Sequence, residues 1–172
     1  ADDLLAGTIR TLLKRGPFEG RHVEDVVVGC TNQAGEDCRN IARRAGLLAG
    51  LPVEVAGMTV NRLCASGLAA VVDAARSIAC DQGDLFVAGG VESMSRAPFV
   101  MAKSERAYGR QLTVFDTTLG SRFPNPRTTA EYGDHAMPET ADHIAVELGI
   151  SRHESDRFAL GSQHRFERAK TA

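Results

Sequence analysis

The sequence has little net charge, no long apolar run and no internal repeat, and each of these absences excludes a class of protein. Its formal net charge at pH 7 is -2, which gives no electrostatic reason to expect nucleic acid or an anionic membrane as a partner. No apolar run approaches the roughly 18–20 residues that a membrane-spanning helix requires. No secretory signal is visible, although the chain starts at Ala1 and an already removed segment stays an open alternative. We therefore expect neither a nucleic acid nor a membrane partner.

The cysteines also lack a paired motif. The chain has four of them, Cys30, Cys38, Cys64 and Cys80, and no C-x-x-C pair, which argues against a structural zinc site or a thioredoxin-type motif. Free thiols are typical of a reducing compartment, so we expect a cytoplasmic protein with no metal. Cys30 and Cys80 are expected to be packing residues, and the role of Cys38 stays open.

Strand and helix signals alternate up to Ser95, which is typical of an α/β domain. With 172 residues, 43% of them hydrophobic, the chain can bury a core of one domain or slightly more. Beyond Ser95 prolines and glycines interrupt the sequence often, and no strand pattern persists. We expect helices over residues 2–14, 40–49, 65–80, 140–148 and 151–170, and strands over 26–29, 53–60 and 85–88.

Side-chain spacing refines three of these helices. The first should turn Leu4, Leu5, Ile9, Leu12 and Leu13 toward the core. The helix over 65–80 is apolar on nearly every side and should be buried on most of them. The last helix should begin with the capping box that Ser151 and Glu154 can form.

Cys64 lies where a strand leads into a helix. At a helix N-terminus, unpaired N–H groups and the positive end of the dipole favour a thiolate over a thiol. The small residues 65–67 that follow would let a substrate or another backbone approach closely. From these residues alone two interpretations stay open, a reactive nucleophile and a small buried apolar side chain.

Four segments of the chain resemble thiolases, the acyl-CoA acyltransferases. They are residues 60–67 (Val-Asn-Arg-Leu-Cys-Ala-Ser-Gly), 29–37, 89–95 (Gly-Gly-Val-Glu-Ser-Met-Ser) and 137–142, and they occur in the family's order. The resemblance implies an α/β fold, with a mixed sheet and helices on both faces. Residues 1–95 would form part of the N-terminal domain, with its first, central strand preceding Ala1. Residues 96–172 would begin a mainly helical loop domain, and the C-terminal half is absent from the chain.

The resemblance also implies a mechanism. Cys64 would attack an acyl-CoA thioester, form an acyl-enzyme and pass the acyl group to a second substrate. Coenzyme A would enter as a substrate, with no permanently bound cofactor, and the complete protein would be a homodimer or homotetramer. The family's Gly-His-Pro and Cys-x-Gly motifs do not occur here, so no histidine is assigned as the base. We expect no multiple turnover and marginal stability from the isolated chain.

Other positions take expected roles from the same resemblance. Met137 would line the acyl pocket, although Ala136 stands where some thiolases have a histidine. The glycine pair 89–90 should pack beside Cys64, and Glu92 should bind backbone donors rather than act in catalysis.

The expected substrate depends on residues 122–142, which look most like β-ketoadipyl-CoA thiolases. Arg122 and Arg127 are candidates for the second carboxylate of such a substrate, or ordinary surface residues. General acetyl-CoA acetyltransferase activity, a decarboxylating ketoacyl-synthase type of enzyme and a non-catalytic fragment are the alternatives. A basic face of the last helix could likewise meet CoA phosphates or only solvent; its residues are Arg157, Arg165, Arg168 and Lys170.

Overall fold

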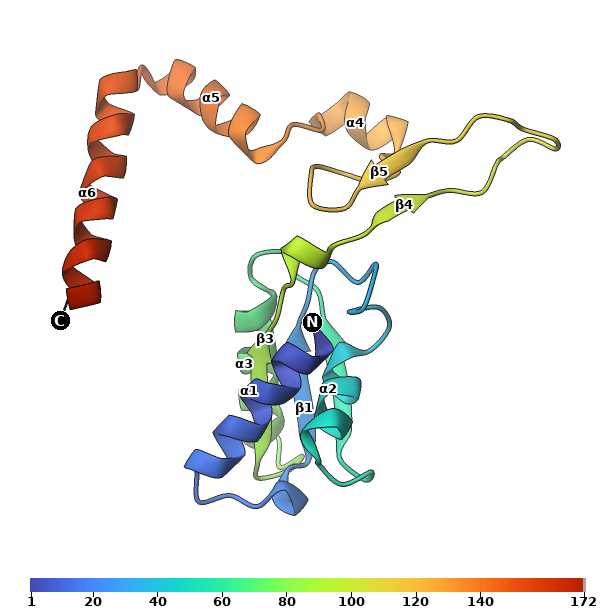
Figure 1. Cartoon of the computed structure of the whole chain (residues 1–172), viewed down its shortest axis with the longest axis vertical. Helices are drawn as coiled ribbons and strands as arrows, with labels where there is room; N and C mark the ends of the chain where they lie inside the picture. Colours follow the sequence, from blue (N-terminus) through green and yellow to red (C-terminus); the bar gives the residue numbers. More distant parts are fainter. Residues whose placement is uncertain (172) are drawn as a thin grey trace. The chain divides into compact units, whose positions relative to one another are not determined.

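The computed structural model describes residues 1–171, and the chain divides into two compact units. The first comprises Ala1–Thr118 and the second begins at Leu119. Figure 1 traces both along the sequence. This division follows packing within the chain; the division between residues 95 and 96 that the family resemblance implies stays a prediction.

The first unit is built on a parallel sheet of three strands. These are β1 (Asp25–Gly29), β2 (Ala56–Val60) and β3 (Phe86–Gly90), in the order β2-β1-β3. Val27 of β1 lies opposite Met58 of β2 and Ala88 of β3. All three strands are parallel. A mixed sheet also needs an antiparallel strand, and residues 1–171 add none to this sheet.

Among the strands of this sheet, β1 holds the central position. Strand β1 pairs with β2 along one edge and with β3 along the other, so no gap is left for a further strand between them. The expected family strand would precede Ala1 and lies outside this chain, so its central place stays a prediction. Strands β2 and β3 form the two edges of the sheet, where one side of each strand's backbone has no ladder partner.

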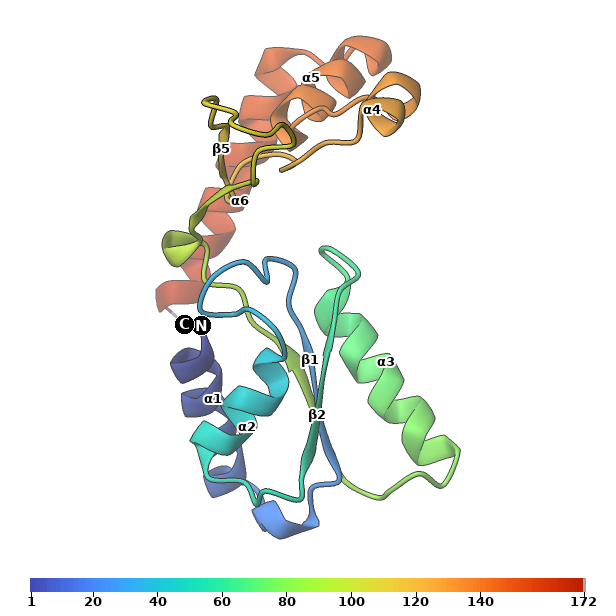
Figure 2. The same cartoon turned by 90° about the vertical axis from the view of Figure 1, so that its right-hand side faces the viewer.

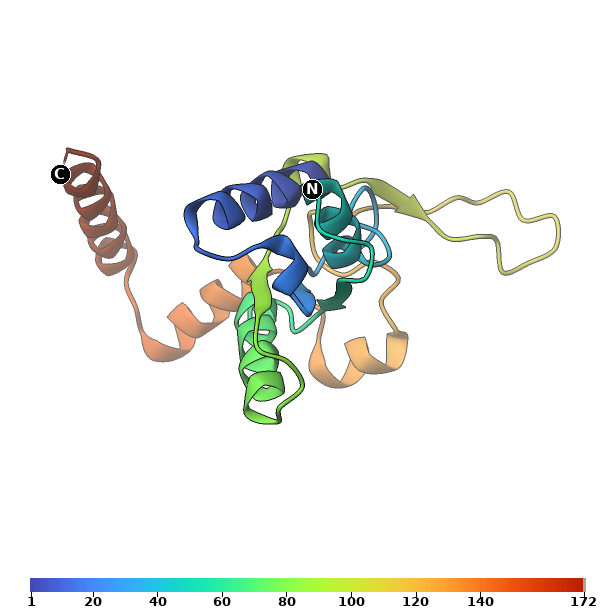
Figure 3. The same ribbon diagram turned by 90° about the horizontal axis from the view of Figure 1, so that it is seen from below.

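Helices cover both faces of the sheet, as predicted. Helices α1 (Asp2–Arg15) and α2 (Ile41–Ala49) lie on one face, and α3 (Ser66–Ala79) lies on the other (Figure 2). The view from below shows the same separation (Figure 3). Asn40 caps the start of α2 by accepting a hydrogen bond from Arg43 N at 3.1 Å, and Gly50, with φ of 90°, ends it.

The core lies between β1 and the helices α1 and α2. Its largest fully buried side chains include Ile9, Val26, Val28 and Ile41. The inner face of α1 is narrower than predicted: Leu5 and Ile9 are buried, Leu13 is partly buried, but Leu4 and Leu12 are exposed. Besides Leu5 and Ile9, the buried side of α1 includes the small residue Ala6.

Helix α3 is less buried than its sequence predicts. Only Ser66, Ala70 and Ala74 are buried, whereas Leu68 is 67% exposed and Val71 is 49% exposed. The helix packs on the sheet by its small residues, and no described element covers its apolar outer side. Strand β2 also differs from the buried strand predicted over 53–60: it starts at Ala56, and its residues are exposed or only partly buried at the sheet's edge.

Two short strands after residue 95 were not predicted. Strands β4 (Phe99–Met101) and β5 (Val114–Asp116) form an antiparallel pair, preceded by the 3-10 turn Met94–Arg96. Three residues are too few for an alternating pattern to be visible in a sequence rich in proline and glycine. Another 3-10 turn, Gly20–His22, precedes β1.

The second unit consists of helices. These are α4 (Pro126–Tyr132), which was not predicted, α5 (Met137–Leu148) and α6 (Arg152–Thr171), and none of them contains a buried residue. The predicted capping box of α6 is present, because Glu154 N donates to Ser151 Oγ at 3.3 Å and Ser151 N donates to Glu154 Oε2 at 2.9 Å. Among residues 1–171, no helix combines the length and the apolar character that crossing a membrane needs.

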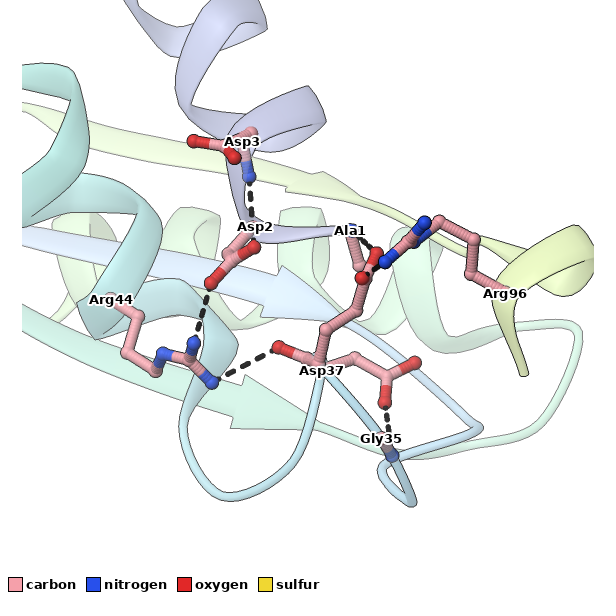
Figure 4. A network of polar contacts seen from close by, with 8 residues as sticks. Ala1, Asp2, Asp3, Gly35, Asp37, Arg44 and Arg96 are labelled. Carbon is pink, nitrogen blue, oxygen red and sulfur yellow. Dashed lines mark hydrogen bonds and ion pairs between the residues drawn. The ribbon is translucent and has the colours of Figure 1, made fainter. Parts of the chain in front are cut away.

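A polar network ties the loop after β1 to its neighbours (Figure 4). Glu36 forms ion pairs with the Ala1 amino group and with Arg96, the latter at 2.7 Å. Arg44 of α2 pairs with Asp2 of α1 at 2.5 Å and donates to the Glu36 carbonyl at 3.0 Å. The loop that begins at the end of β1 is therefore held from α1, from α2 and from the segment after β3.

Candidate active site

The loop that carries Cys64 connects β2 to α3. Cys64 is exposed and lies immediately before Ala65, the residue that caps the start of α3. This confirms the predicted position, at the junction of a strand and a helix. Because α3 starts here, the thiol lies near the positive end of the helix dipole.

Leu63 gives the loop its sharp turn. Its φ angle is 48°, in the left-handed region that non-glycine residues seldom adopt. Asn61 Oδ1 accepts a hydrogen bond from Leu63 N at 2.9 Å. Ser66 accepts from Arg62 N at 2.8 Å and donates to Leu63 O at 2.6 Å. These hydrogen bonds offset the cost of the unusual backbone and fix the residue that precedes the cysteine.

Two glycines bring the strands into contact with the start of α3. A Cβ atom on Gly29 would lie 2.3 Å from the backbone carbon of Ser66 and 2.5 Å from Gly67 N. A Cβ atom on Gly90 would lie 3.3 Å from Gly67 Cα. The glycine pair 89–90 was expected to make this approach; Gly90 makes it with Gly29, while a Cβ on Gly89 would meet nothing within 4 Å.

A cavity of about 550 Å³ opens beside Cys64. Its size suits a small-molecule site. The loop after β1 lines it together with the Cys64 loop, the end of β3 and the segment after β5. The lining residues include Cys30, Asn32, Cys64, Glu92, Met94 and Thr117.

Glu92 binds the loop after β1, which agrees with the structural role expected for it. Its carboxylate accepts hydrogen bonds from Thr31 N at 2.6 Å, Thr31 Oγ1 at 2.8 Å and Asn32 N at 3.2 Å. Partial burial raises the pKa of Glu92, but these hydrogen bonds outweigh it and hold the pKa below its usual value. The carboxylate is therefore negative at neutral pH.

Cys30 is the second thiol at the cavity, and its surroundings keep it protonated. Burial, followed by the negative charge of Glu92, raises the pKa of Cys30 to about 12. Its Sγ also donates to Glu92 Oε1 at 3.4 Å. A thiol in this state is a poor nucleophile, so Cys30 is a packing residue as predicted. Cys80 is exposed at the C-cap of α3, so the expectation that it is a packing residue was wrong.

Asn32 and Thr117 close another side of the cavity, and the sequence did not single them out. Asn32 Nδ2 donates to Thr117 Oγ1 at 3.1 Å and to Thr117 O at 3.3 Å. Thr117 in turn donates from Oγ1 to Pro98 O at 2.8 Å. Asn32 lies within a segment that carries the family resemblance, but nothing in the sequence pairs it with a residue 85 positions away.

The remaining site candidates lie in the second unit. Met137 is the first residue of α5, and its side chain is 74% exposed. Arg127 is exposed in α4, and Arg122 is partly buried before it. His135 and His143 pack edge to face with ring centroids 4.7 Å apart. Within residues 1–171, no group of three or more histidine, cysteine or acidic side chains could hold a metal ion.

Comparisons with known proteins show the family of this chain. The family described as "Thiolase, N-terminal domain" matches residues 1–172. The chain belongs to the thiolase family. A 3-oxoadipyl-CoA/3-oxo-5,6-dehydrosuberyl-CoA thiolase of Escherichia coli (strain K12) is 55% identical over all of this chain and 43% of the relative. A β-ketoadipyl-CoA thiolase of Pseudomonas knackmussii is 53% identical over the same shares.

A solved thiolase-family structure has the same fold. The acetyl-CoA acetyltransferase of Bacillus anthracis matches with a TM-score of 0.76 at 32% identity, over 92% of this chain and 39% of that one. These figures confirm the α/β fold expected from the thiolase resemblance. The chain spans about 43% of the length of the first relatives that it matches.

Proposed function

We propose that this chain supplies the nucleophilic cysteine, Cys64, of an acyl-CoA acyltransferase of the thiolase type. The observation that carries the proposal is the exposed Cys64 thiol on the wall of a cavity of about 550 Å³, directly before α3. Membership of the thiolase family supports the reaction class. Cys30, the other thiol at this cavity, stays protonated and does not compete.

The proposed reaction transfers an acyl group through a thioester on the enzyme. The Cys64 thiolate attacks the carbonyl carbon of an acyl-CoA, a new carbon–sulfur bond forms, and the bond to the CoA sulfur breaks. CoA leaves as a thiolate that takes up a proton. In thiolysis the Cys64 thiolate instead attacks the β-keto carbon of a β-ketoacyl-CoA, the Cα–Cβ bond breaks, and acetyl-CoA leaves as an enolate that takes up a proton. The acyl group on Cys64 then passes to the sulfur of a free CoA, which restores the cysteine. Condensation of acetyl-CoA is the reverse. Coenzyme A is a substrate in this scheme, and no resident cofactor is involved.

The isolated chain should complete only the first half of this reaction. Neither Gly-His-Pro nor Cys-x-Gly, the motifs expected to carry the base and the second acid/base, occurs in the sequence. We expect an acyl group to accumulate on Cys64 without release of product in many cycles. Repeated cleavage of acetoacetyl-CoA by the purified chain, abolished by Cys64→Ala, would contradict this.

For the substrate we infer a β-keto dicarboxylic acyl-CoA such as β-ketoadipyl-CoA. Relatives named β-ketoadipyl-CoA thiolase are 51–55% identical to the chain, whereas a 3-ketoacyl-CoA thiolase of Acinetobacter baumannii is 40% identical. Arg122 and Arg127 are proposed to receive the second carboxylate, and Met137 to line the acyl pocket. In a protein that carries this chain and turns over, cleavage of β-ketoadipyl-CoA should be faster than that of acetoacetyl-CoA, and loss of both arginines should remove the preference.

Assembly and location follow from the same proposal. We infer a homodimer or homotetramer for the complete protein, which light scattering after gel filtration can test. The four free cysteines support a reducing compartment such as the cytoplasm.

The decisive experiment maps acyl transfer from acetyl-CoA to the chain by mass spectrometry. Cys80 provides an internal control, because it is an exposed free thiol at the other end of the same helix. We expect an acetyl group on Cys64 and none on Cys80, and we expect Cys64→Ala but not Cys80→Ala to abolish it. Equal labelling of the two thiols would show that exposure alone explains the reaction, and it would refute the assignment.

A further inference from the structure

Glu92 and the Cys64 loop are joined by a continuous series of hydrogen bonds. Glu92 Oε1 accepts from Asn32 N at 3.2 Å and from Thr31 N at 2.6 Å. On the other side, Thr31 O accepts from Asn61 Nδ2 at 3.3 Å. Asn61 Oδ1 then accepts from Leu63 N at 2.9 Å. The series ends at the residue that precedes the cysteine.

A single peptide group connects the two halves of this series. The N–H of Asn32 and the C=O of Thr31 belong to the same peptide unit, and its atoms lie close to one plane with the two groups pointing in opposite directions. Glu92 holds the N–H end and Asn61 holds the C=O end. A hydrogen bond at one end polarises the group and strengthens the bond at the other. Glu92 can therefore orient Asn61 without touching it.

Leu63 is the point at which such orientation matters. Its backbone has φ of 48°, which is unfavourable for a branched apolar residue, and Leu63 is 71% exposed, so packing of its own side chain does little to hold it. The hydrogen bond from Leu63 N to Asn61 is thus one of the few local interactions that maintain this geometry. Relaxation at Leu63 would turn Cys64 relative to the cavity.

We propose that Glu92 and Asn61 are positioning residues that hold the Cys64 loop in its reactive conformation, coupled through the peptide group between Thr31 and Asn32. The proposal rests on the proposed function of Cys64, and it assigns Glu92 no proton transfer. It lets the charge of Glu92 act on the Cys64 loop through backbone geometry. Ser66 holds the far side of the same loop independently, through Arg62 N and Leu63 O.

The test is a cycle of variants read by hydrogen exchange of the Leu63 amide in the 172-residue chain. Asn61→Ala should lower the protection of Leu63 by about threefold to tenfold, the fold-change that corresponds to an ordinary hydrogen bond. Glu92→Ala leaves that hydrogen bond in place and weakens it through the peptide group, so it should lower the protection by a smaller factor, up to about twofold. Protection of the Val27 amide in β1 should not change. Asn61→Asp keeps the oxygen that accepts from Leu63 N but loses the amide that donates to Thr31 O, so it disconnects Leu63 from Glu92. Adding Glu92→Ala to Asn61→Asp should therefore lower the protection of the Leu63 amide no further. Glu54→Ala, which removes an exposed carboxylate outside the series, is the matched control.

A second measurement connects the loop to acyl transfer. The rate at which acetyl-CoA acylates Cys64 should fall in Glu92→Ala and in Asn61→Ala, and should stay unchanged in Glu54→Ala. Unchanged protection of the Leu63 amide in Glu92→Ala would overturn the proposal. An equal loss of protection at the Leu63 and Val27 amides would also overturn it, because it would show that the substitution destabilises the whole fold. If acetyl-CoA labels Cys64 in no variant, the proposed function fails, whereas the exchange cycle still decides whether Glu92 positions the loop.

Discussion

Replacing Gly29 with alanine should destabilise the chain by moving α3 away from the sheet. The φ angle of Gly29 is not positive, so alanine can adopt the backbone and the cost is steric. The added Cβ would lie 2.3 Å from the Ser66 carbonyl carbon and 2.6 Å from Ser66 O, about 1 Å closer than van der Waals contact allows. Both atoms belong to the backbone of α3, so no side-chain rotation relieves the overlap. Overpacking of this kind costs about 1–3 kcal/mol of unfolding free energy.

Gly89 provides the matched control for this substitution. It lies one residue before Gly90 in β3, the neighbouring strand, and a Cβ there would meet nothing within 4 Å. Urea denaturation should give Gly89→Ala an unfolding free energy within about 0.5 kcal/mol of the unsubstituted chain. Gly29→Ala should also change the alkylation rate of Cys64, because the start of α3 carries that loop. Equal stability of the two variants, or greater loss in Gly89→Ala, would refute the reasoning.

Three further predictions follow from the hydrogen bonds and titrating groups. Asn40→Ala should cost about 1–2 kcal/mol in urea denaturation, since it removes the cap of α2; a loss below about 0.3 kcal/mol would contradict this. The pKa of Cys30, about 12 against an ordinary 9.0, lies above its unfolded value, so the contribution of Cys30 to stability should be constant below about pH 9 and should be lost from there toward pH 12; over that range stability should decrease less in Cys30→Ala. Folding lowers the pKa of Glu92. Its contribution to the stability of the chain should therefore be present above its ordinary pKa of 4.5 and disappear as pH falls through the folded pKa. In acid titrations followed by circular dichroism, the stability difference between the chain and Glu92→Gln should therefore shrink below pH 4.5; a constant difference would count against it.

The sequence predicted elements well where the burial pattern is decided locally. Residues 26–29 of β1 read as a continuous apolar run and are buried, and α2 has Asn40 as its N-cap and Gly50 as its C-cap, as expected. It failed where burial depends on distant partners. The apolar outer side of α3 predicted burial, but Leu68 is exposed. Apolar residues indicate which sides of a helix could be covered, but they do not show whether another segment covers them.

The Cys64 site divides in the same way. Local sequence determined that a cysteine stands at a strand–helix junction with small residues after it, and the pattern carried the resemblance to thiolases. The cavity needed the tertiary structure, because its walls come from four segments that are separated by up to 89 positions between Gly29 and Thr118.

By itself, then, the sequence determined the identity and the chain position of the proposed nucleophile. Only the tertiary structure decided that Glu92 binds the loop after β1, that Cys30 stays protonated, and that Gly29 rather than Gly89 meets the start of α3. The physical reason is that hydrogen-bond geometry, desolvation and steric contact depend on distances between segments. Parallel pairing of β1 with β2 and β3 sets those distances, and that pairing is not visible in the sequence of any one strand.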